Sequence, residues 1–371
     1  MTDETDELLN AITGLVPPIL TALEALSFVG RHLHPPNIAS LVDAVSAAPG
    51  PVQTGLAAFQ AADWPEHLVP FSEQLIKVAG HVDNAYSGLA EAGTDEKGVF
   101  KAYRALGQYT RAIEALYPVA LMLPPVSRFF VDHPQRDDEA LRERIANADA
   151  SRDNIGIIHA GNEKDTRGGF SLYVPEYYDE TRAYPLIMAM HGGSGHGRDF
   201  LWTWLTTARS RGAIVVSPTS AEGTWSLMGP DVDSANIDGM LAHVSGHWNV
   251  DSSKLLLTGM SDGGTFSYIS GLRGESPFTH LAPSSASFHP MLLDGYPAER
   301  LDGLPIYLMH GVLDWMFPVD VARATNEALS AAGASVVYRE IDDLSHTYPR
   351  DENPRIMDWF LDEPQEAEPE A

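Results

Sequence analysis

Cysteine is entirely absent from the 371 residues of this chain. This absence excludes disulfide bonds, thiolate metal ligands and a cysteine nucleophile, so any covalent catalysis must use another side chain.

His32 and His34 have no further metal ligand beside them in the sequence. The acidic stretch 231–239 lacks the glycine and the glutamate of a calcium loop, and we interpret Asp233 or Ser234 as a helix cap. We expect neither a metal nor a cofactor.

Basic residues are scarce, since 24 Lys and Arg stand against 51 Asp and Glu and the formal net charge is −27. Such a negative field repels the phosphate backbone of nucleic acids and the surface of anionic membranes. We therefore expect no nucleic-acid partner. The acidity itself is interpreted as a solubilising surface and not as a site for cations.

Long apolar runs are missing as well. No run of about 18 apolar residues occurs, so we expect no integral membrane segment. The first ten residues, MTDETDELLN, are acidic, whereas a secretory leader begins with Lys or Arg. The expected location of the protein is the cytoplasm.

Residues 1–150 are predicted to form a helical N-terminal domain. Apolar residues recur at helical intervals along two candidate helices, from Leu8 to Leu15 and from Phe100 to Leu116. Pairs of prolines divide this region into several segments, at 17–18, 35–36 and 124–125. Nothing in these residues resembles a known family. Their function is left open between a cap over the second domain and a module for homo-oligomerisation.

Residues 151–361 show short strand-like runs that alternate with helical ones. Two runs, 155–160 and 170–175, are predicted to pair antiparallel across a polar turn. Five further runs are typical of buried strands, at 185–190, 213–217, 254–259, 304–310 and 335–341. Helical patterns separate them, which predicts an α/β fold with a mostly parallel sheet and helices on both faces. The acidic stretch 362–371 is predicted to be a disordered tail.

The predicted strand 254–259 runs into Gly259-Met260-Ser261-Asp262-Gly263, a G-x-S-x-G pattern at the start of a helix. A serine on such a sharp turn has a strained backbone, and the residues two before and two after it must be small so that strand and helix can approach. The pattern predicts Ser261 as a nucleophile whose Oγ stands clear of the sheet.

A glycine-rich loop follows the predicted strand 185–190, with the sequence HGGSG. Glycine lets the backbone come close to a substrate, and backbone N–H groups are natural donors to the negative oxygen of a tetrahedral intermediate. We expect an oxyanion hole formed by the N–H groups of Gly193 and Asp262.

Two further strands end beside residues that complete the chemistry. Asp314 follows the strand 304–310, and His346 follows the last strand. An imidazole must take the proton of a serine nucleophile, and a carboxylate must orient that imidazole. Asp342 and Asp343 also precede His346, but Asp314 is favoured because it follows a strand at the expected position.

The stretch from about residue 155 to 361 resembles the α/β-hydrolase superfamily, within the phospholipase/carboxylesterase and dienelactone-hydrolase-like group of serine esterases. The resemblance rests on PLIMAMHGGSG, LLLTGMSDGG, YLMHGVLDWMFPV and LSHTYP. It implies hydrolysis of a small or medium carboxylic ester through an acyl-enzyme, and some relatives with this pattern act on feruloyl esters or polyesters. Dienelactone hydrolases proper use a cysteine, which this chain lacks.

Two other functions stay open. A prolyl-oligopeptidase-like peptidase shares the double glycine after Asp262, although those enzymes carry a β-propeller where this chain is predicted to be helical. A binding protein could keep this fold without catalytic activity, yet Ser261, Asp314 and His346 are all present here. Four residues are expected either to line the substrate pocket or to pack beneath its loops: Trp225, Trp315, Met316 and Phe317.

Overall fold

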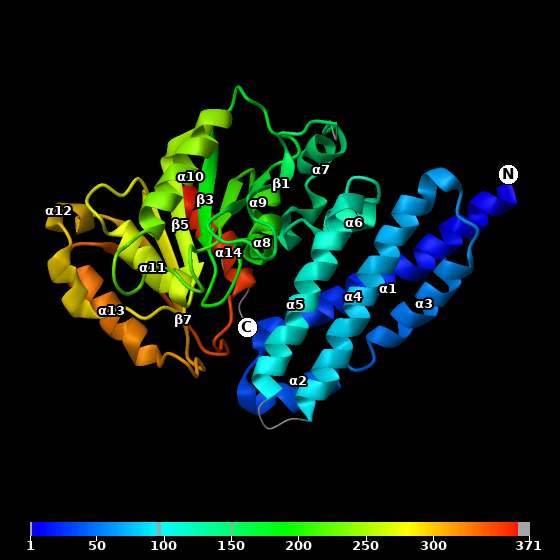
Figure 1. Ribbon diagram of the computed structural model, residues 1–371, viewed down its shortest axis with the longest axis horizontal. Helices are drawn as coiled ribbons and strands as arrows, with labels where there is room; N and C mark the ends of the chain where they lie inside the picture. The colour runs from blue at the N-terminus through cyan, green and yellow to red at the C-terminus, as the bar shows by residue number, and fades with distance from the viewer. Residues whose placement is uncertain (1, 95–97, 150, 363–371) are drawn as a thin grey trace. The chain divides into compact units, whose positions relative to one another are not determined.

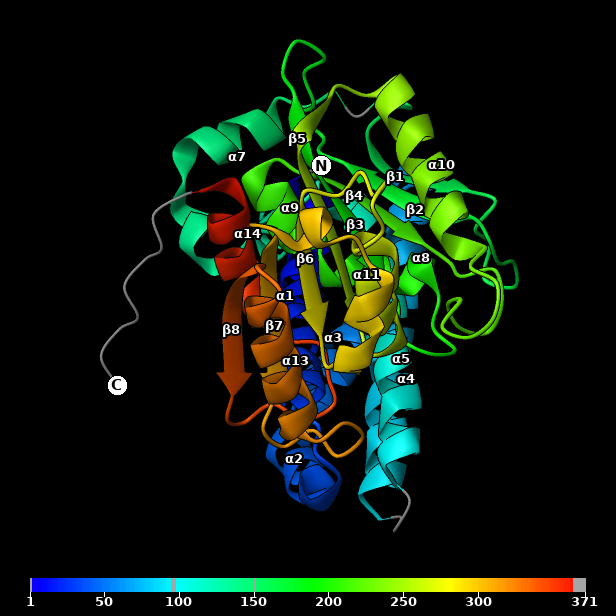
Figure 2. The ribbon, with the colours of Figure 1, turned by 90° about the vertical axis from the view of Figure 1, so that its left-hand side faces the viewer.

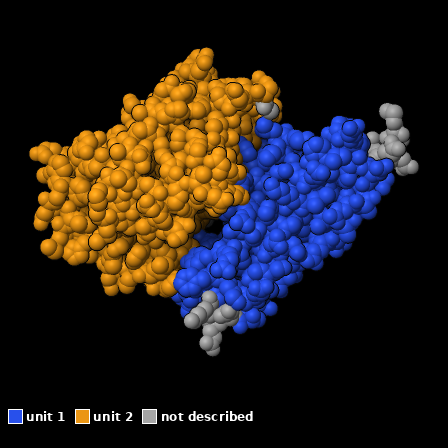
Figure 3. Space-filling model, viewed as in Figure 1, with its two compact units in different colours: residues 1–131 blue, residues 132–371 orange. Residues whose placement is uncertain are grey.

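The computed structural model describes residues 2–94, 98–149 and 151–362 (Figure 1 and Figure 2). The chain divides into two compact units, residues 1–131 and residues 132–371, which we call unit 1 and unit 2 (Figure 3). Of the predicted acidic tail, only Asp362 is described, and it ends the last helix in a left-handed conformation. Residues 363–371 lie outside the described residues.

Unit 1 contains only α-helices and short 3-10 turns in its described residues, which confirms the helical N-terminal region. Each of the longer helices buries an apolar row; in α1 this row includes Leu15, Ile19, Leu23 and Leu26, at a spacing of three or four residues. The helices are α1 (Thr2–His32), α2 (Ile38–Val45), α3 (Pro49–Ala61), α4 (Val69–Gly93), α5 (Gly98–Leu116) and α6 (Pro124–Phe129).

Among the described residues, α1 is one helix that is long and apolar enough to cross a membrane, over Asp6–His32. Length and composition alone give this result, and a core helix of a helical bundle meets the same criteria. The buried row of α1 is such a core face, and two prolines, Pro17 and Pro18, lie inside the helix.

Unit 2 begins at Asp132, whereas the sequence pattern placed the boundary near residue 150. Asp132 binds α9 (Leu205–Arg211): its N–H donates to Ser210 Oγ at 2.8 Å, and its carboxylate accepts from Thr207 Oγ1 at 3.1 Å. The helix α7 (Glu139–Ala146) follows within the same unit. Because these contacts join residues about 75 positions apart, the local apolar pattern gives no sign of them.

Unit 2 is built on one eight-stranded sheet in the order β1-β2-β4-β3-β5-β6-β7-β8. β2 runs antiparallel to both β1 and β4, and the strands from β3 to β8 are parallel, as the sequence pattern predicted. β6 was not predicted. The strands are β1 (Gly156–Ala160), β2 (Phe170–Val174), β3 (Tyr184–Met190), β4 (Ile214–Pro218), β5 (Val250–Met260), β6 (His280–Ser284), β7 (Pro305–Gly311) and β8 (Ser335–Ile341).

Helices cover both faces of this sheet. Figure 1 shows α10 (Asp233–His247) and α11 (Asp262–Gly271) on the left of the strands, with α9 and α14 (Asn353–Leu361) on the right. Alternate residues of β3, Leu186, Met188 and Met190, join the buried cluster beneath α10, α11 and α13 (Val319–Ala331). Since side chains alternate along a strand, the residues between them face the opposite helices. The carboxyl ends of the parallel strands therefore meet at one edge, where ligands bind in sheets of this kind.

We predict that Gly263→Ala disrupts unit 2, because a Cβ at this position would lie 2.4 Å from the carbonyl oxygen of Met190. Backbone atoms cannot give way cheaply, so unfolding in denaturant should show a loss of about 2 kcal/mol or more. Gly239→Ala is the matched control. This exposed helical glycine has open space around it, and its replacement should stabilise the protein by about 0.5 to 1 kcal/mol. Equal effects at the two positions would contradict the close contact.

A second prediction concerns the pH dependence of stability. Burial raises the pKa of Asp132 to about 6, against the hydrogen bond from Thr207 and the positive charges of Arg211 and Arg136. An unfolded aspartate has a pKa of about 3.9, so between these values the folded chain holds a proton that the unfolded chain lacks. The contribution of Asp132 to stability is therefore present below about pH 4 and is lost as the pH rises through 6.

Asp132→Asn removes this titration. The stability of the variant relative to the wild type should rise between pH 4 and pH 7, measured by denaturant unfolding at each pH. A difference that is constant over this range would show that Asp132 titrates normally.

Candidate active site

Ser261 lies on a tight turn between β5 and α11, as the sequence predicted. Its φ of 56° and ψ of −119° are a backbone conformation that residues other than glycine rarely adopt. A Cβ on Gly259 would lie 2.5 Å from the backbone of Gly263, so strand and helix touch directly beside the turn. The N–H of Ser261 donates to Ser284 O at 3.0 Å, which ties the turn to the end of β6.

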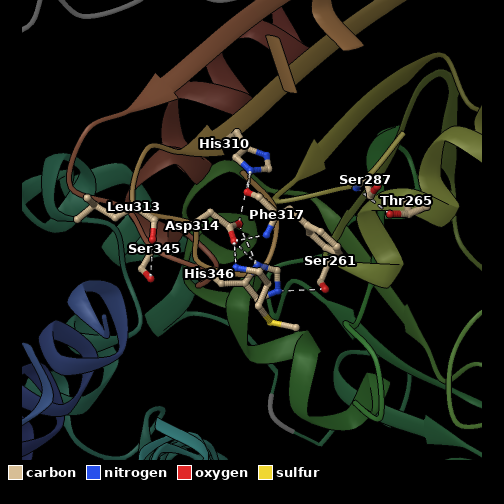
Figure 4. Close-up of polar contacts among 10 residues, drawn as sticks. Ser261, Thr265, Ser287, His310, Leu313, Asp314, Phe317, Ser345 and His346 are labelled. Carbon is tan, nitrogen blue, oxygen red and sulfur yellow. Dashed lines mark hydrogen bonds and ion pairs between the residues drawn. The ribbon is translucent and has the colours of Figure 1, made fainter. Parts of the chain in front are cut away.

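Three side chains from different strand ends form one hydrogen-bonded chain (Figure 4). His346 Nε2 lies 3.1 Å from Ser261 Oγ, and His346 Nδ1 lies 2.9 Å from Asp314 Oδ2. A carboxylate only accepts, so Nδ1 carries the proton and Nε2 of the neutral ring can accept from the serine hydroxyl. This is the arrangement in which an imidazole can take the proton of a serine nucleophile.

Backbone groups hold Asp314 in place. Its Oδ1 accepts from the N–H of Met316 at 2.9 Å and of Phe317 at 2.8 Å. Burial acts to raise the pKa of Asp314, but the hydrogen bonds from His346, Phe317 and Met316 outweigh it and the pKa is lowered. The carboxylate is therefore ionised when the imidazole takes up a proton. Asp342 and Asp343 are exposed in the loop after β8, so the carboxylate beside His346 is that of Asp314.

The two expected oxyanion donors, Gly193 and Asp262, lie against each other. A Cβ on Gly193 would be 2.6 Å from Asp262 Oδ2, so only glycine fits in this loop without moving the carboxylate. Asp262 is the first residue of α11, where an N–H has no partner within the helix. No described residue accepts a hydrogen bond from either of the two N–H groups. Both are available to a ligand.

The expected pocket residues separate into two groups. Trp315 and Met316 are exposed at the end of β7, and the Phe317 ring meets the His346 ring edge-on at 5.4 Å. Trp225, by contrast, is only 3% exposed and stacks on Phe266 at 5.3 Å. Trp225 packs beneath the loops of the site, which is the second of the two roles expected for it.

The sequence analysis missed His310 near the site and gave Asp233 a different role. His310 is buried at the end of β7, with Nε2 2.8 Å from Phe317 O and 3.6 Å from Asp314 Oδ2. A histidine that ends an apolar strand was the available signal. The sequence predicted Asp233 or Ser234 as the cap of α10. In the structure Asp231 has this role, because its Oδ1 accepts the N–H of Ser234 at 2.9 Å. Asp233 instead binds the loop after β4. Metal-ligating clusters of three or more side chains are absent from the described residues.

The strand order, the turn that carries Ser261 and the histidine and aspartate after the last strands define unit 2 as an α/β-hydrolase in fold. In sequence, the chain is 27% identical over 158 residues to a probable feruloyl esterase C of Aspergillus terreus, covering 41% of this chain and 56% of that protein. It is 28% identical over 134 residues to a bifunctional acetylxylan esterase/xylanase of Neocallimastix patriciarum, covering 35% of this chain and 19% of that protein.

Among solved structures, the chain is similar to a thermostable esterase, with a TM-score of 0.46 and 18% identity over 56% of this chain and 62% of that one. The chain spans about half or less of the length of the curated relatives it matches. No family model matches it.

We predict that Asp314→Asn lowers kcat for any substrate of Ser261 by about 10³- to 10⁴-fold, because the amide would stabilise the wrong imidazole tautomer. Asp342→Asn makes the same change at an exposed carboxylate and should leave kcat within about twofold of the wild type. Steady-state kinetics of the two variants measure the difference. A larger loss at Asp342 would move the orienting role to that residue.

Proposed function

We propose that this protein is a serine carboxylic-ester hydrolase that works through an acyl-enzyme on Ser261. The observation that carries the proposal is the hydrogen-bonded chain from Ser261 through His346 to Asp314, beside two N–H groups that no described residue binds. These three residues are the proposed catalytic triad, and the N–H groups of Gly193 and Asp262 are the proposed oxyanion hole.

Each step of such a reaction has its group in the site. Ser261 Oγ attacks the acyl carbon while its proton passes to His346 Nε2, and Asp314 stabilises the resulting imidazolium. The carbonyl oxygen becomes negative and accepts hydrogen bonds from Gly193 and Asp262. His346 then returns the proton to the departing alcohol, which leaves an acyl-enzyme. Water attacks this ester by the same steps and releases the acid.

An ester, and not a peptide, is the proposed substrate class. The sequence relatives are named as esterases of feruloyl and acetylxylan type, which supports ester chemistry in this chain. The unit 1 helices are also unlike the β-propeller of prolyl-oligopeptidase-like enzymes. Unit 2 holds the whole sheet and all three triad residues, so the chemistry does not require unit 1. For unit 1 we propose a role as a cap or in oligomerisation.

The exposed apolar residues of unit 2 support an ester with an apolar part. In the described residues of this unit, every large hydrophobic side chain that is exposed lies in the loops and the short 3-10 helix that follow β4, β6 or β7: Met228, Val232, Met291, Leu292, Val312, Trp315 and Met316. These loops follow the carboxyl ends of parallel strands, at the edge of the sheet where Ser261 lies. Apolar side chains gathered around a site favour apolar ligands.

We predict that a fluorophosphonate modifies Ser261 and that Ser261→Ala abolishes both this labelling and the hydrolysis of p-nitrophenyl butyrate. The loss of hydrolysis should be several orders of magnitude, because the triad acts as a unit. Mass spectrometry of the labelled peptide identifies the residue. A peptide p-nitroanilide assayed beside the ester separates the two substrate classes, and faster cleavage of the anilide would favour a peptidase. A label on another residue would contradict the assignment of Ser261.

A further inference from the structure

The loop after β4 makes three contacts in succession with the proposed oxyanion hole. Gly223 O accepts the N–H of Ser194 at 2.8 Å. Thr224 Oγ1 donates to Asp262 Oδ2, and Trp225 Nε1 donates to His191 O at 2.7 Å. The three consecutive residues of the loop therefore bind three different parts of the site.

Each contact bears on one of the two proposed donors. His191 and Ser194 flank the glycine pair that includes Gly193, so the bonds from Trp225 and Gly223 fix both ends of this short turn. Thr224 holds the side chain of Asp262, whose own N–H is the second donor. The same carboxylate packs against Gly193, since a Cβ there would lie 2.6 Å from Asp262 Oδ2. The distance between the donors thus depends on where this loop places them.

The loop is itself held at both ends by a buried carboxylate. Asp233, 2% exposed, accepts the N–H of Ala221 at 2.9 Å with Oδ1 and the N–H of Ser226 at 2.8 Å with Oδ2. The Ser226 hydroxyl also donates to Oδ2, at 2.9 Å. The hydrogen bonds of Asp233 to Ala221 and Ser226 lie on either side of residues 223–225 and restrict the movement of this segment.

His191 adds a fourth connection. Its Nδ1 donates to Gly192 O at 2.7 Å, and its Nε2 accepts the N–H of Ser220 at 3.1 Å. Burial lowers the pKa of His191 to about 4, so the neutral ring keeps both bonds at neutral pH. The imidazole therefore joins the glycine turn to the beginning of the loop.

We propose that Thr224 and Trp225 are positioning residues that set the oxyanion hole, through a loop that Asp233 anchors. This proposal rests on the proposed function, because the hole serves acyl transfer. Both donors are backbone N–H groups, so their direction is determined by the residues that hold the backbone. Preorganised donors stabilise the charge of a transition state most when they need not move during the reaction.

The hydrogen bond from Thr224 to Asp262 has an electrostatic consequence. Its carboxylate lies beside a site where a second negative charge develops during the reaction. Two like charges repel, and the repulsion grows as they approach each other. Thr224 binds Oδ2 directly and holds the carboxylate in one orientation, so that the Asp262 N–H, and not the carboxylate, is presented to the substrate oxygen.

Three variants of the loop test the proposal. Thr224→Val removes the hydroxyl and keeps the shape, and Trp225→Phe removes Nε1–H and keeps an aromatic ring on Phe266. We expect each to lower kcat for p-nitrophenyl butyrate about 10- to 100-fold, since removing one donor outright costs about 10²- to 10³-fold. KM should stay within about threefold of the wild type. Thr224→Ser keeps the hydroxyl and should restore most of the rate.

Matched controls make the same chemical changes elsewhere in unit 2. Thr279 Oγ1 accepts the N–H of Leu255 at 3.0 Å at the start of β6, and Trp248 Nε1 donates to Asn154 O at 2.8 Å. Thr279→Val and Trp248→Phe should lower the thermal midpoint at least as much as the loop variants do. They should leave kcat within about twofold of the wild type.

The rate of phosphonylation of Ser261 by a fluorophosphonate is the second measurement. The phosphoryl oxygen of the reagent occupies the oxyanion hole, so Thr224→Val and Trp225→Phe should slow labelling in proportion to kcat. This rate needs no ester substrate. If the wild-type protein is labelled at Ser261 but hydrolyses no ester, the proposed function is wrong. The labelling rates of the variants would still test whether Thr224 and Trp225 position the oxyanion hole.

Each of three kinetic outcomes would overturn the proposal: loop variants with wild-type kcat and labelling rate, a rise in KM without a fall in kcat, or no recovery with Thr224→Ser. Should Thr224→Val fail to fold, Trp225→Phe decides the question. If both loop variants lose rate only as far as they unfold, as judged by circular dichroism at the assay temperature, their role is structural and the proposal is wrong.

Discussion

The contact between backbones at the turn of Ser261 is the constraint on which the rest of the site depends. Gly259 and Gly263 meet there, and a Cβ on Gly263 would also lie 2.5 Å from His191 O. The end of β5, the start of α11 and the end of β3 therefore touch without side chains between them. This contact places the serine hydroxyl, the first N–H of α11 and the glycine turn within one small volume. The positive φ of Ser261 is strain that the surrounding structure holds in place.

The parts of the site that could be predicted from sequence are those that depend on a position along a strand. Ser261, Asp314 and His346 each follow a strand by a few residues, and parallel strands bring their carboxyl ends to one edge. A sequence pattern that identifies the strands therefore also predicts that residues as far apart as 261 and 346 lie close together. β6 escaped this reasoning because Pro283 interrupts a run of only five residues, and proline argues against a central strand. The structure accommodates it in the middle of the sheet, where Pro283 pairs with Gly259.

The parts that could not be predicted depend on contacts between distant residues. Trp225 is an aromatic residue in a loop near the site, and sequence alone does not distinguish a pocket wall from a buried support. Its partners, His191 and Phe266, lie about 35 and 40 positions away in opposite directions. Asp233 stands at the start of a helix, where an acidic residue is ordinarily a cap. Its carboxylate turns back to the preceding loop instead, and nothing in the local pattern marks that choice.

In the described residues of the site, directed hydrogen bonds bind three carboxylates, and no lysine or arginine forms an ion pair with them. Asp314 accepts two N–H groups and faces an imidazole, Asp233 accepts two N–H groups and a hydroxyl, and Asp262 accepts a hydroxyl. A hydrogen bond depends on direction far more than the attraction of a point charge such as a lysine ammonium does. Each carboxylate therefore fixes the geometry of the groups that bind it. We propose that the N–H groups of Gly193 and Asp262, to which no described residue is hydrogen-bonded, stabilise an anionic transition state beside these carboxylates.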